Sequence, residues 1–314
     1  MWKSSKTNQI IKMYKNDRLS DFFFHNGLII YGKKNQDIYE LDYELIIQLF
    51  EKHGIILFRD FDLNGKDIKK FSDRFTNNYS QDAQRRSSRF GNRNIRNVDY
   101  GFEQVDLHSE ASYSPSWPEV IWFFCNKAPR NGGETIFCDG IELWKSLSSD
   151  LKGFFLSQQI HYKINIPVLK GRKKFLKSKK SWLIENIGSG IGLVDKADGC
   201  LKMVQKRYAV NESRFPGKLA FANHLLVEVK HEPQLLDRTI SNNRKIPKDM
   251  YEQIKEKASC ITYAHKWENR DLLMIDNKRF LHGRKQLSPV EGRDIVILQT
   301  KTTNFGYGVS TKNI

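Results

Sequence analysis

Short apolar runs near both ends of the chain constrain its fold more than any other feature. Residues 54–59, 118–125 and 134–138 form one group, and residues 271–276 and 293–299 form the other. Runs of this length that end in turn-forming residues are typical of buried strands. The residues between the two groups follow a less regular pattern. The strands of the two groups are therefore expected to pair with one another in the same sheets, although they are far apart in the sequence.

This arrangement predicts a mainly β protein with flanking helices, in the form of a double-stranded β-helix, or jelly roll. We expect a single domain over residues 1–314, with core strands at about 54–140 and 260–300. Residues of about 152–260 are expected to form a large helix-bearing lid insertion. Helical spacing of apolar residues predicts helices at 41–53, 66–78 and 140–151, and, within the insertion, near 219–230 and 247–258.

Composition and short-range patterns indicate the cellular compartment of the protein and the partners that its charge would attract. The apolar runs are too short to span a bilayer, and residues 1–9 lack the apolar stretch of a secretory signal. The four cysteines show no C-x-x-C spacing, which favours a reducing, cytoplasmic compartment. The formal net charge of +16 would attract polyanions, but heavy use of Lys, Ile and Asn throughout the chain is the favoured explanation.

Two basic segments stand out. A polar loop is expected at residues 80–97. Within it, residues 85–96 carry five arginines and lead directly into the strand that contains His108. Residues 170–180 carry seven basic side chains. One interpretation is a solvated polar surface. The other is that both segments flank the mouth of a site and assist an anionic substrate or an acidic partner.

His108 and Glu110 are candidate metal ligands. On a strand, alternate side chains point to the same face, so this pair would project side by side. A second histidine is needed to complete a facial triad of two imidazoles and one carboxylate, and the candidate is His282. Such a triad leaves three positions of an octahedral ion open, as in non-heme Fe(II) oxygenases. A lone His-x-Glu is also common by chance, on a solvated strand edge.

A set of motifs in a fixed order favours the metal triad over a chance His-x-Glu on a strand edge. It comprises His108-Ser-Glu110, Gly133-Glu-Thr135, Asp276-Asn277, His282-Gly-Arg284 and Arg293. This set resembles the iron(II)/2-oxoglutarate-dependent dioxygenases of the TauD/TfdA superfamily over about residues 54–300. The resemblance implies Fe(II) held by His108, Glu110 and His282, with 2-oxoglutarate and dioxygen as co-substrates. It also implies that Thr135, 27 residues after His108, and Arg293, 11 residues after His282, hold the far carboxylate of 2-oxoglutarate.

A second resemblance is to SyrP-like and clavaminate synthase-like amino-acid hydroxylases, which use Glu in the iron triad. The stretches that carry it are His108–Tyr113, Trp117-Pro118, Phe123–Cys125 and Phe221–His224. The resemblance implies hydroxylation of an unactivated C–H of an amino acid or a derivative, free or bound to an acidic carrier protein, in specialised metabolism. Gln104, Asn223 and Arg284 are the expected substrate contacts, and no catalytic side chain is expected beyond the iron site. Ile297 occupies the position of the sulfonate-binding Arg of taurine dioxygenase, which argues against a sulfonate substrate. Glu110 argues against halogenation, because halogenating relatives carry Gly or Ala there.

Other functions remain open from the sequence. The same residues could carry out desaturation, cyclisation or epimerisation, depending on how the substrate is placed. A basic nucleic-acid-binding protein without catalysis would explain the charge, but only Phe175 and Trp182 serve as stacking aromatics near the 170–180 segment. A catalytically dead β-fold binding module is disfavoured, because no metal or co-substrate position is lost. Neither a nucleic acid nor a membrane is therefore an expected partner.

Overall fold

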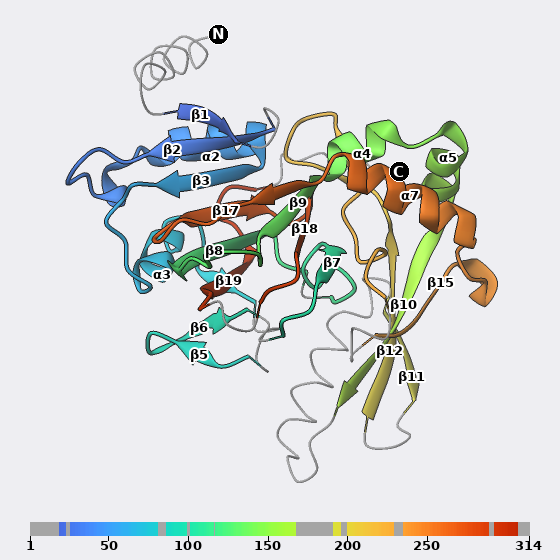
Figure 1. Cartoon of the computed structure of the whole chain (residues 1–314). Coiled ribbons are helices and arrows are strands. Elements are labelled where there is room, and N and C mark those ends of the chain that lie inside the picture. The colour runs from blue at the N-terminus through green and yellow to red at the C-terminus, as the bar shows by residue number, and fades with distance from the viewer. Residues whose placement is uncertain are drawn as a thin grey trace.

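In the computed structural model, two β-sheets lie face to face and helices cover their outer sides (Figure 1). The structure describes residues 19–22, 26–80, 86–98, 101–115, 117–167, 191–195, 200–228, 235–288 and 292–306. The mainly β class and the jelly roll predicted from the sequence are confirmed. Among the described residues, no helix is both long and apolar enough to cross a bilayer.

The larger sheet has nine strands and contains most of the predicted apolar runs. Its order is β1-β2-β3-β17-β8-β19-β6-β5, with β4 paired to β19. The bounds are β1 Leu19–Phe22, β2 Gly27–Tyr31, β3 Ile55–Arg59, β17 Leu272–Asp276, β8 Val120–Lys127, β19 Asp294–Thr302, β6 Asn92–Asn97, β5 Ser88–Arg89 and β4 Asn78–Tyr79. Strands from both ends of the chain thus alternate in the middle of one sheet.

Alternation along each strand divides the larger sheet into two apolar faces. Ile56 and Phe58 point outward and pack under helices α2 (Tyr43–His53) and α3 (Asp67–Ser72). Leu57 and Phe123 point inward, toward the smaller sheet. A strand that is buried on both faces reads as a continuous apolar run, which explains the pattern seen in the sequence.

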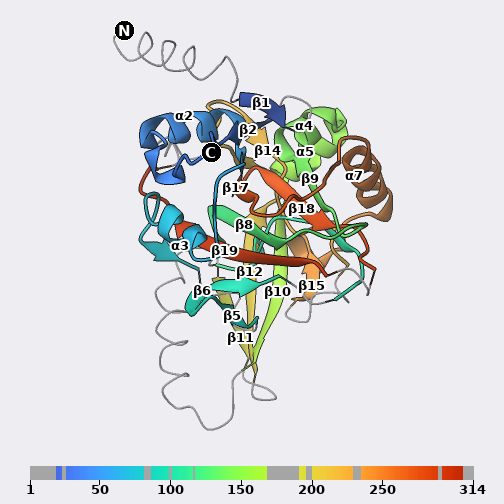
Figure 2. The same ribbon diagram turned by 60° about the vertical axis from the view of Figure 1, so that its left-hand side comes forward.

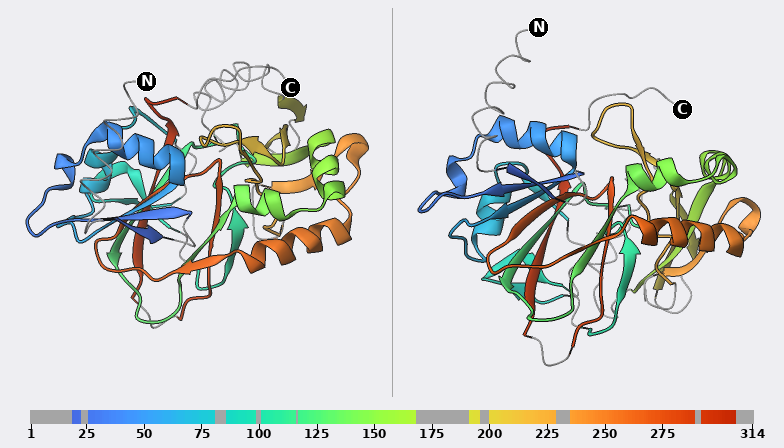
Figure 3. Two further views of the ribbon diagram at one scale, coloured as in Figure 1. Left: turned by 90° about the horizontal axis from the view of Figure 1, so that it is seen from above. Right: turned by 45° about the horizontal axis from the view of Figure 1, so that its top comes forward.

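The smaller sheet has four strands in the order β16-β9-β18-β7. The bounds are β16 Tyr263–His265, β9 Thr135–Asp139, β18 Phe280–Arg284 and β7 Val105–His108. Its outer face carries Cys138 and Leu281, which pack against α4 (Gly140–Ser146), α5 (Ser149–Ser157) and α7 (Lys248–Cys260). In Figure 3 these helices lie on the side of the molecule opposite to α2. The candidate site lies between the two sheets.

Residues within the predicted insertion form a sheet of their own, in the order β11-β12-β10-β15. The bounds are β11 Ile191–Asp195, β12 Cys200–Tyr208, β10 Gln159–Pro167 and β15 Leu235–Thr239. In Figure 2 these strands extend below the sheet sandwich. The Lys-rich segment 170–180 lies outside the described residues.

The predicted helices at 41–53 and 247–258 correspond to α2 and α7, and the helix predicted at 140–151 is divided into α4 and α5. Three local predictions were wrong. The helix at 66–78 ends at Ser72. Residues 80–97 are not only a loop, because β5 and β6 lie within them. The helix near 219–230 is absent from the described residues, since β14 (Leu219–Ala220) pairs with β13 (Asn211–Glu212) and Phe221 donates its N–H to Gly140.

Candidate metal centre and active site

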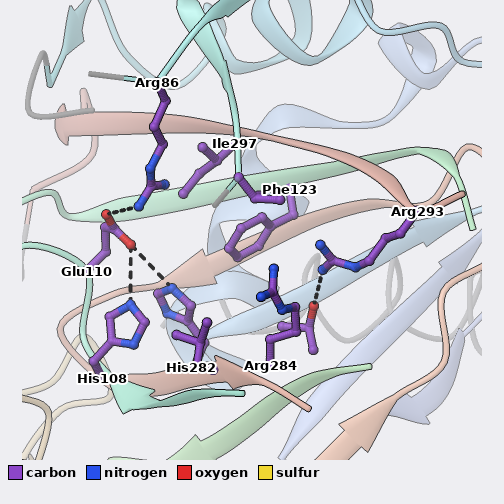
Figure 4. Close-up of a pocket in the computed structure, with 12 residues that line it drawn as sticks. Arg86, His108, Glu110, Phe123, His282, Arg284, Arg293 and Ile297 are labelled. Atoms are coloured by element: carbon purple, nitrogen blue, oxygen red, sulfur yellow. Dashed lines mark hydrogen bonds and ion pairs between the residues drawn. The ribbon is translucent and has the colours of Figure 1, made fainter. Parts of the chain in front are cut away.

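Strand β18 carries two of the predicted site residues on one face. Phe280, His282 and Arg284 alternate along the strand and point between the sheets, whereas Leu281 packs outward. Arg284 lies opposite Thr135 on the neighbouring strand β9. Simple alternation therefore brings His282, Arg284 and Thr135 to a common pocket, which Figure 4 shows.

Strand β7 reaches the same pocket with an irregular register. His282 lies opposite His108 and Arg284 lies opposite Val105, so β7 has one more residue than β18 over this stretch. Such a bulge reverses which side chains face inward, and both His108 and Val105 line the pocket. The close approach requires Gly283, because a Cβ atom there would lie 2.4 Å from the carbonyl oxygen of Val105.

Glu110 is not on the strand, which corrects the geometry predicted from the sequence. β7 ends at His108, and Glu110 lies in the following turn. The side chain of Asn277 holds this turn. Its Oδ1 accepts the Glu110 N–H at 2.8 Å, and its Nδ2 donates to the carbonyls of Glu110 and Pro118. The Ser109 hydroxyl donates in turn to the Asn277 carbonyl at 2.6 Å.

The three predicted ligands meet at one point. Oε2 of Glu110 lies 3.5 Å from Nε2 of His108 and 3.6 Å from Nε2 of His282. One ligand atom from each residue lies within 4.8 Å of the others. Nδ1 of His108 lies 2.8 Å from the Asp106 carbonyl, so it carries the proton and leaves Nε2 free to coordinate. This donor set and geometry fit a divalent metal ion.

The pKa shifts in the pocket favour the metal-binding forms. Burial by itself would raise the pKa of Glu110, but Arg86 and the adjacent imidazoles of the two histidines hold it well below its usual value. Burial, with His108 nearby, lowers the pKa of His282 to about 4. At neutral pH the carboxylate is therefore ionised and the His282 imidazole is neutral, as metal coordination requires.

Arg293 lies at the other end of the pocket. Its Nη2 donates to Oγ1 of Thr135 at 3.3 Å, and the same oxygen accepts a hydrogen bond from Trp267 Nε1 at 2.9 Å. Burial is the main cause that lowers the pKa of Arg293 to about 10, and the nearby positive charge of Arg284 adds to it. Within the described part of the chain it forms no ion pair, and its Nε is buried without a hydrogen-bond partner. A buried guanidinium in this state fits a ligand carboxylate.

The three predicted substrate contacts have different surroundings. Arg284 lines the pocket, and its Nη2 donates to the carbonyls of Gly101 and Glu103. Gln104 is exposed and bonds to Asp106, because the bulge removes it from the inward face on which alternation would place it. Asn223 is buried beside Ala209 and Leu225, and its carbonyl accepts the N–H of Ser109. It therefore supports the turn before Glu110 and does not line the pocket.

Two residues that contact Glu110 were missed by the sequence analysis as individual site residues. Arg86 places Nη2 at 3.5 Å from Oε1 of Glu110, and Gln299 Nε2 donates to the same oxygen at 3.0 Å. Arg86 belongs to the basic segment 85–96, so the charge pattern was a usable signal, but it did not single out one arginine. Arg89 of that segment instead pairs with Asp294, and Arg93 is exposed. Nothing in the sequence marks Gln299.

The structure predicts that Asn277 is needed to hold Glu110 in place. Asn277→Ala removes three hydrogen bonds made by a fully buried side chain, which should destabilise the protein by roughly 2–4 kcal/mol. It should also weaken metal binding by about 10- to 100-fold, as is usual when the support of a ligand is lost. Chemical unfolding and Mn(II) titration of the same samples would measure both effects.

Asn269→Ala is the matched control. Asn269 also accepts a backbone N–H, from Ala128, but it is exposed and lies outside the pocket. An Asn277→Ala protein that binds Mn(II) as tightly as the control would show that the Glu110 turn does not depend on this amide.

Comparisons with known proteins identify a family and related structures. A family model described as taurine catabolism dioxygenase TauD, TfdA family, matches residues 31–299. The chain is 23% identical over 253 residues to 3-((Z)-2-isocyanoethenyl)-1H-indole synthase of Fischerella ambigua, covering 80% of this chain and 83% of that protein. It is 22% identical over 194 residues to pentalenolactone F synthase of Streptomyces avermitilis, covering 61% and 59%. Among solved structures, PvcB of Pseudomonas aeruginosa superposes with a TM-score of 0.56 at 16% identity, covering 90% of this chain and 91% of that one. PvcB is described as an Fe, alpha-ketoglutarate dependent oxygenase from an isonitrile synthetic pathway.

Proposed function

Because the chain belongs to the TauD/TfdA family of iron(II)- and 2-oxoglutarate-dependent dioxygenases, we propose that His108, Glu110 and His282 are its iron ligands and that it oxidises an amino-acid-like small molecule. The observation that carries the proposal is the meeting of these three side chains in a pocket that also contains Arg293. The proposed metal site and the proposed binding site for the 2-oxoglutarate carboxylate therefore lie in one pocket, as an oxygenase of this kind requires.

The protein's own residues prepare the metal site in three ways. The Asp106 carbonyl orients His108, and Asn277 fixes the turn that presents Glu110. Gln299 holds one carboxylate oxygen of Glu110 and leaves the other directed at the two imidazoles. Bound Fe(II) with 2-oxoglutarate supplies the capacity to activate dioxygen for attack on an unactivated C–H bond.

Thr135 and Arg293 are proposed to hold the far carboxylate of 2-oxoglutarate. A planar guanidinium can pair with a carboxylate through two parallel hydrogen bonds and stays charged when buried. Trp267 fixes the Thr135 hydroxyl, whose oxygen also accepts the hydrogen bond from Arg293. The co-substrate would therefore run from this end of the pocket toward the metal ligands.

The substrate is proposed to be an amino acid or a derivative of one, oxidised in natural-product biosynthesis. Two relatives, the isocyanoethenyl-indole synthase and pentalenolactone F synthase, carry names that belong to such pathways. Apolar side chains line the part of the pocket nearest the metal ligands, including Phe123 and Ile297, and suit a hydrocarbon portion of the substrate. Hydroxylation is the proposed outcome, with desaturation, cyclisation or epimerisation as alternatives. An acidic carrier protein that presents the substrate is a second candidate for a partner, favoured by the formal charge of +16.

The test is turnover of 2-oxoglutarate to succinate by the purified protein, with Fe(II), dioxygen and a panel of amino acids and derivatives. Carrier-bound aminoacyl thioesters belong in the same panel. We expect Fe(II)-dependent succinate formation that one class of compound stimulates, with a matching oxidised product by mass spectrometry. Failure to bind both Fe(II) and 2-oxoglutarate would refute the assignment of the site.

A further inference from the structure

We propose that Arg86 binds a free carboxylate of the substrate, so that the protein acts on a small carboxylic acid and not on an acid esterified to a carrier protein. This inference rests on the proposed function and assigns the group by which the substrate is recognised. Arg86 approaches the metal ligands from the side of the pocket opposite to Arg293, as Figure 4 shows.

The position of Arg86 separates it from the proposed co-substrate site. Arg293 and Thr135 lie together at one end of the pocket, whereas Arg86 lies beside Glu110 and Ile297 at the other. A co-substrate that extends from Arg293 to the metal ligands leaves Arg86 on the far side of the metal. An anion that contacts Arg86 there would place its neighbouring carbons next to the metal centre.

The charges in the pocket favour an anionic substrate. Three arginines and one glutamate line it, so the charged side chains among the described lining residues leave two net positive charges. Fe(II) and the dianion of 2-oxoglutarate cancel each other, and this excess therefore persists in the loaded protein. The guanidinium of Arg86 would attract the carboxylate of a substrate in this positively charged pocket.

The contact between Arg86 and Glu110 is one that a ligand can replace. Its Nη2 lies 3.5 Å from Oε1 of Glu110, longer than the roughly 2.7–2.9 Å of a strong charged hydrogen bond. That oxygen already accepts a hydrogen bond from Gln299 at 3.0 Å. Once a metal ion neutralises Glu110, the attraction for Arg86 weakens, and its guanidinium can turn to the substrate without leaving Glu110 unsupported.

Strand β6 holds the backbone of Arg86 at the pocket. Arg96 donates from Nη1 to the Arg86 carbonyl at 3.0 Å, and Asn97 bonds to both the backbone and the hydroxyl of Ser87. The Arg86 side chain is 21% exposed, so it lies at the boundary between pocket and solvent. A substrate that enters would therefore meet this cation early.

The experiment measures binding to the full-length protein loaded with Mn(II) and N-oxalylglycine, an inert stand-in for iron and co-substrate. The probes are the free and N-acetylated L-amino acids, each paired with its carboxamide, and isothermal titration calorimetry gives the affinities. For the wild type we expect at least one carboxylate to bind, about tenfold or more tightly than its amide. Arg86→Gln should remove this preference but leave the affinities for Mn(II) and N-oxalylglycine within about threefold of wild type.

Two further variants complete the design. Arg93→Gln removes the same charge from the same hairpin at an exposed position outside the pocket, and it should behave as wild type. Arg86→Lys keeps the charge without the planar fork, so it should retain a weaker preference for the carboxylate. This variant also provides the test if Arg86→Gln does not fold.

Three results would overturn the proposal. An Arg86→Gln protein that still prefers carboxylates would assign recognition to another group. Loss of Mn(II) or N-oxalylglycine binding in that variant would show that Arg86 serves the metal ligands instead. A wild-type complex that binds none of the carboxylates would also refute it. Failure of the wild type to form the loaded complex, in contrast, would refute the proposed function itself.

Discussion

Replacing His282 with alanine is expected to abolish Fe(II)-dependent conversion of 2-oxoglutarate to succinate. His282 supplies one of the three proposed ligand atoms, and its Nε2 lies 3.6 Å from Oε2 of Glu110. With only His108 and Glu110 left, the site offers two protein ligands where the facial arrangement needs three. Turnover without added substrate should fall to the level of free Fe(II) in buffer. Mn(II) titration followed by electron paramagnetic resonance should show the loss of tight metal binding directly.

His161→Ala is a suitable control for this experiment. His161 lies on strand β10, opposite Lys206, and does not line the pocket. It should retain both metal binding and turnover. A His282→Ala protein with near-normal turnover would remove His282 from the triad, and the third ligand would have to be sought elsewhere.

Replacing Arg293 with alanine is expected to weaken 2-oxoglutarate binding more than any other change at the far end of the pocket. The loss of one partner from a buried charge pair costs on the order of 2–5 kcal/mol, which is a rise in apparent Kd of roughly 30-fold to several thousand-fold. Mn(II) affinity should change little, because Arg293 contacts Thr135 and none of the three metal ligands. Titration of 2-oxoglutarate into the Mn(II)-loaded protein would measure the effect.

Arg270→Ala serves as the comparison, since its guanidinium pairs with Asp62 on the surface and its side chain is 60% exposed. The cost there should be near zero to about 1 kcal/mol of stability, without an effect on co-substrate binding. If the Arg293→Ala protein binds 2-oxoglutarate normally, the carboxylate must be held by another cation, and Arg284 is the nearest candidate in the pocket.

Several parts of this protein could be predicted from local patterns alone. Helix α2 follows from the spacing of Leu45, Leu49 and Phe50, and Gly54 ends it with a left-handed backbone. The strands β3, β8 and β17 follow from continuous apolar runs, because both faces of their sheet are covered. His282, Arg284 and Thr135 meet as simple alternation would place them. In each case the predictive signal is the spacing of residues that are close in sequence.

Contacts between distant segments decided the rest. A bulge opposite Gly283 kept Gln104, which precedes β7, from the inward-facing position that simple alternation predicts, because a shift of one residue reverses every side chain that follows. Asn277, far away in the sequence, holds the turn that presents Glu110. Pairing between β13 and β14 replaced a predicted helix. The sequence by itself therefore determined which chemical groups the pocket could use. Only the tertiary structure selected Arg86 from its basic segment and gave Glu110 its position, because both depend on hydrogen bonds from other segments of the chain that no local pattern records.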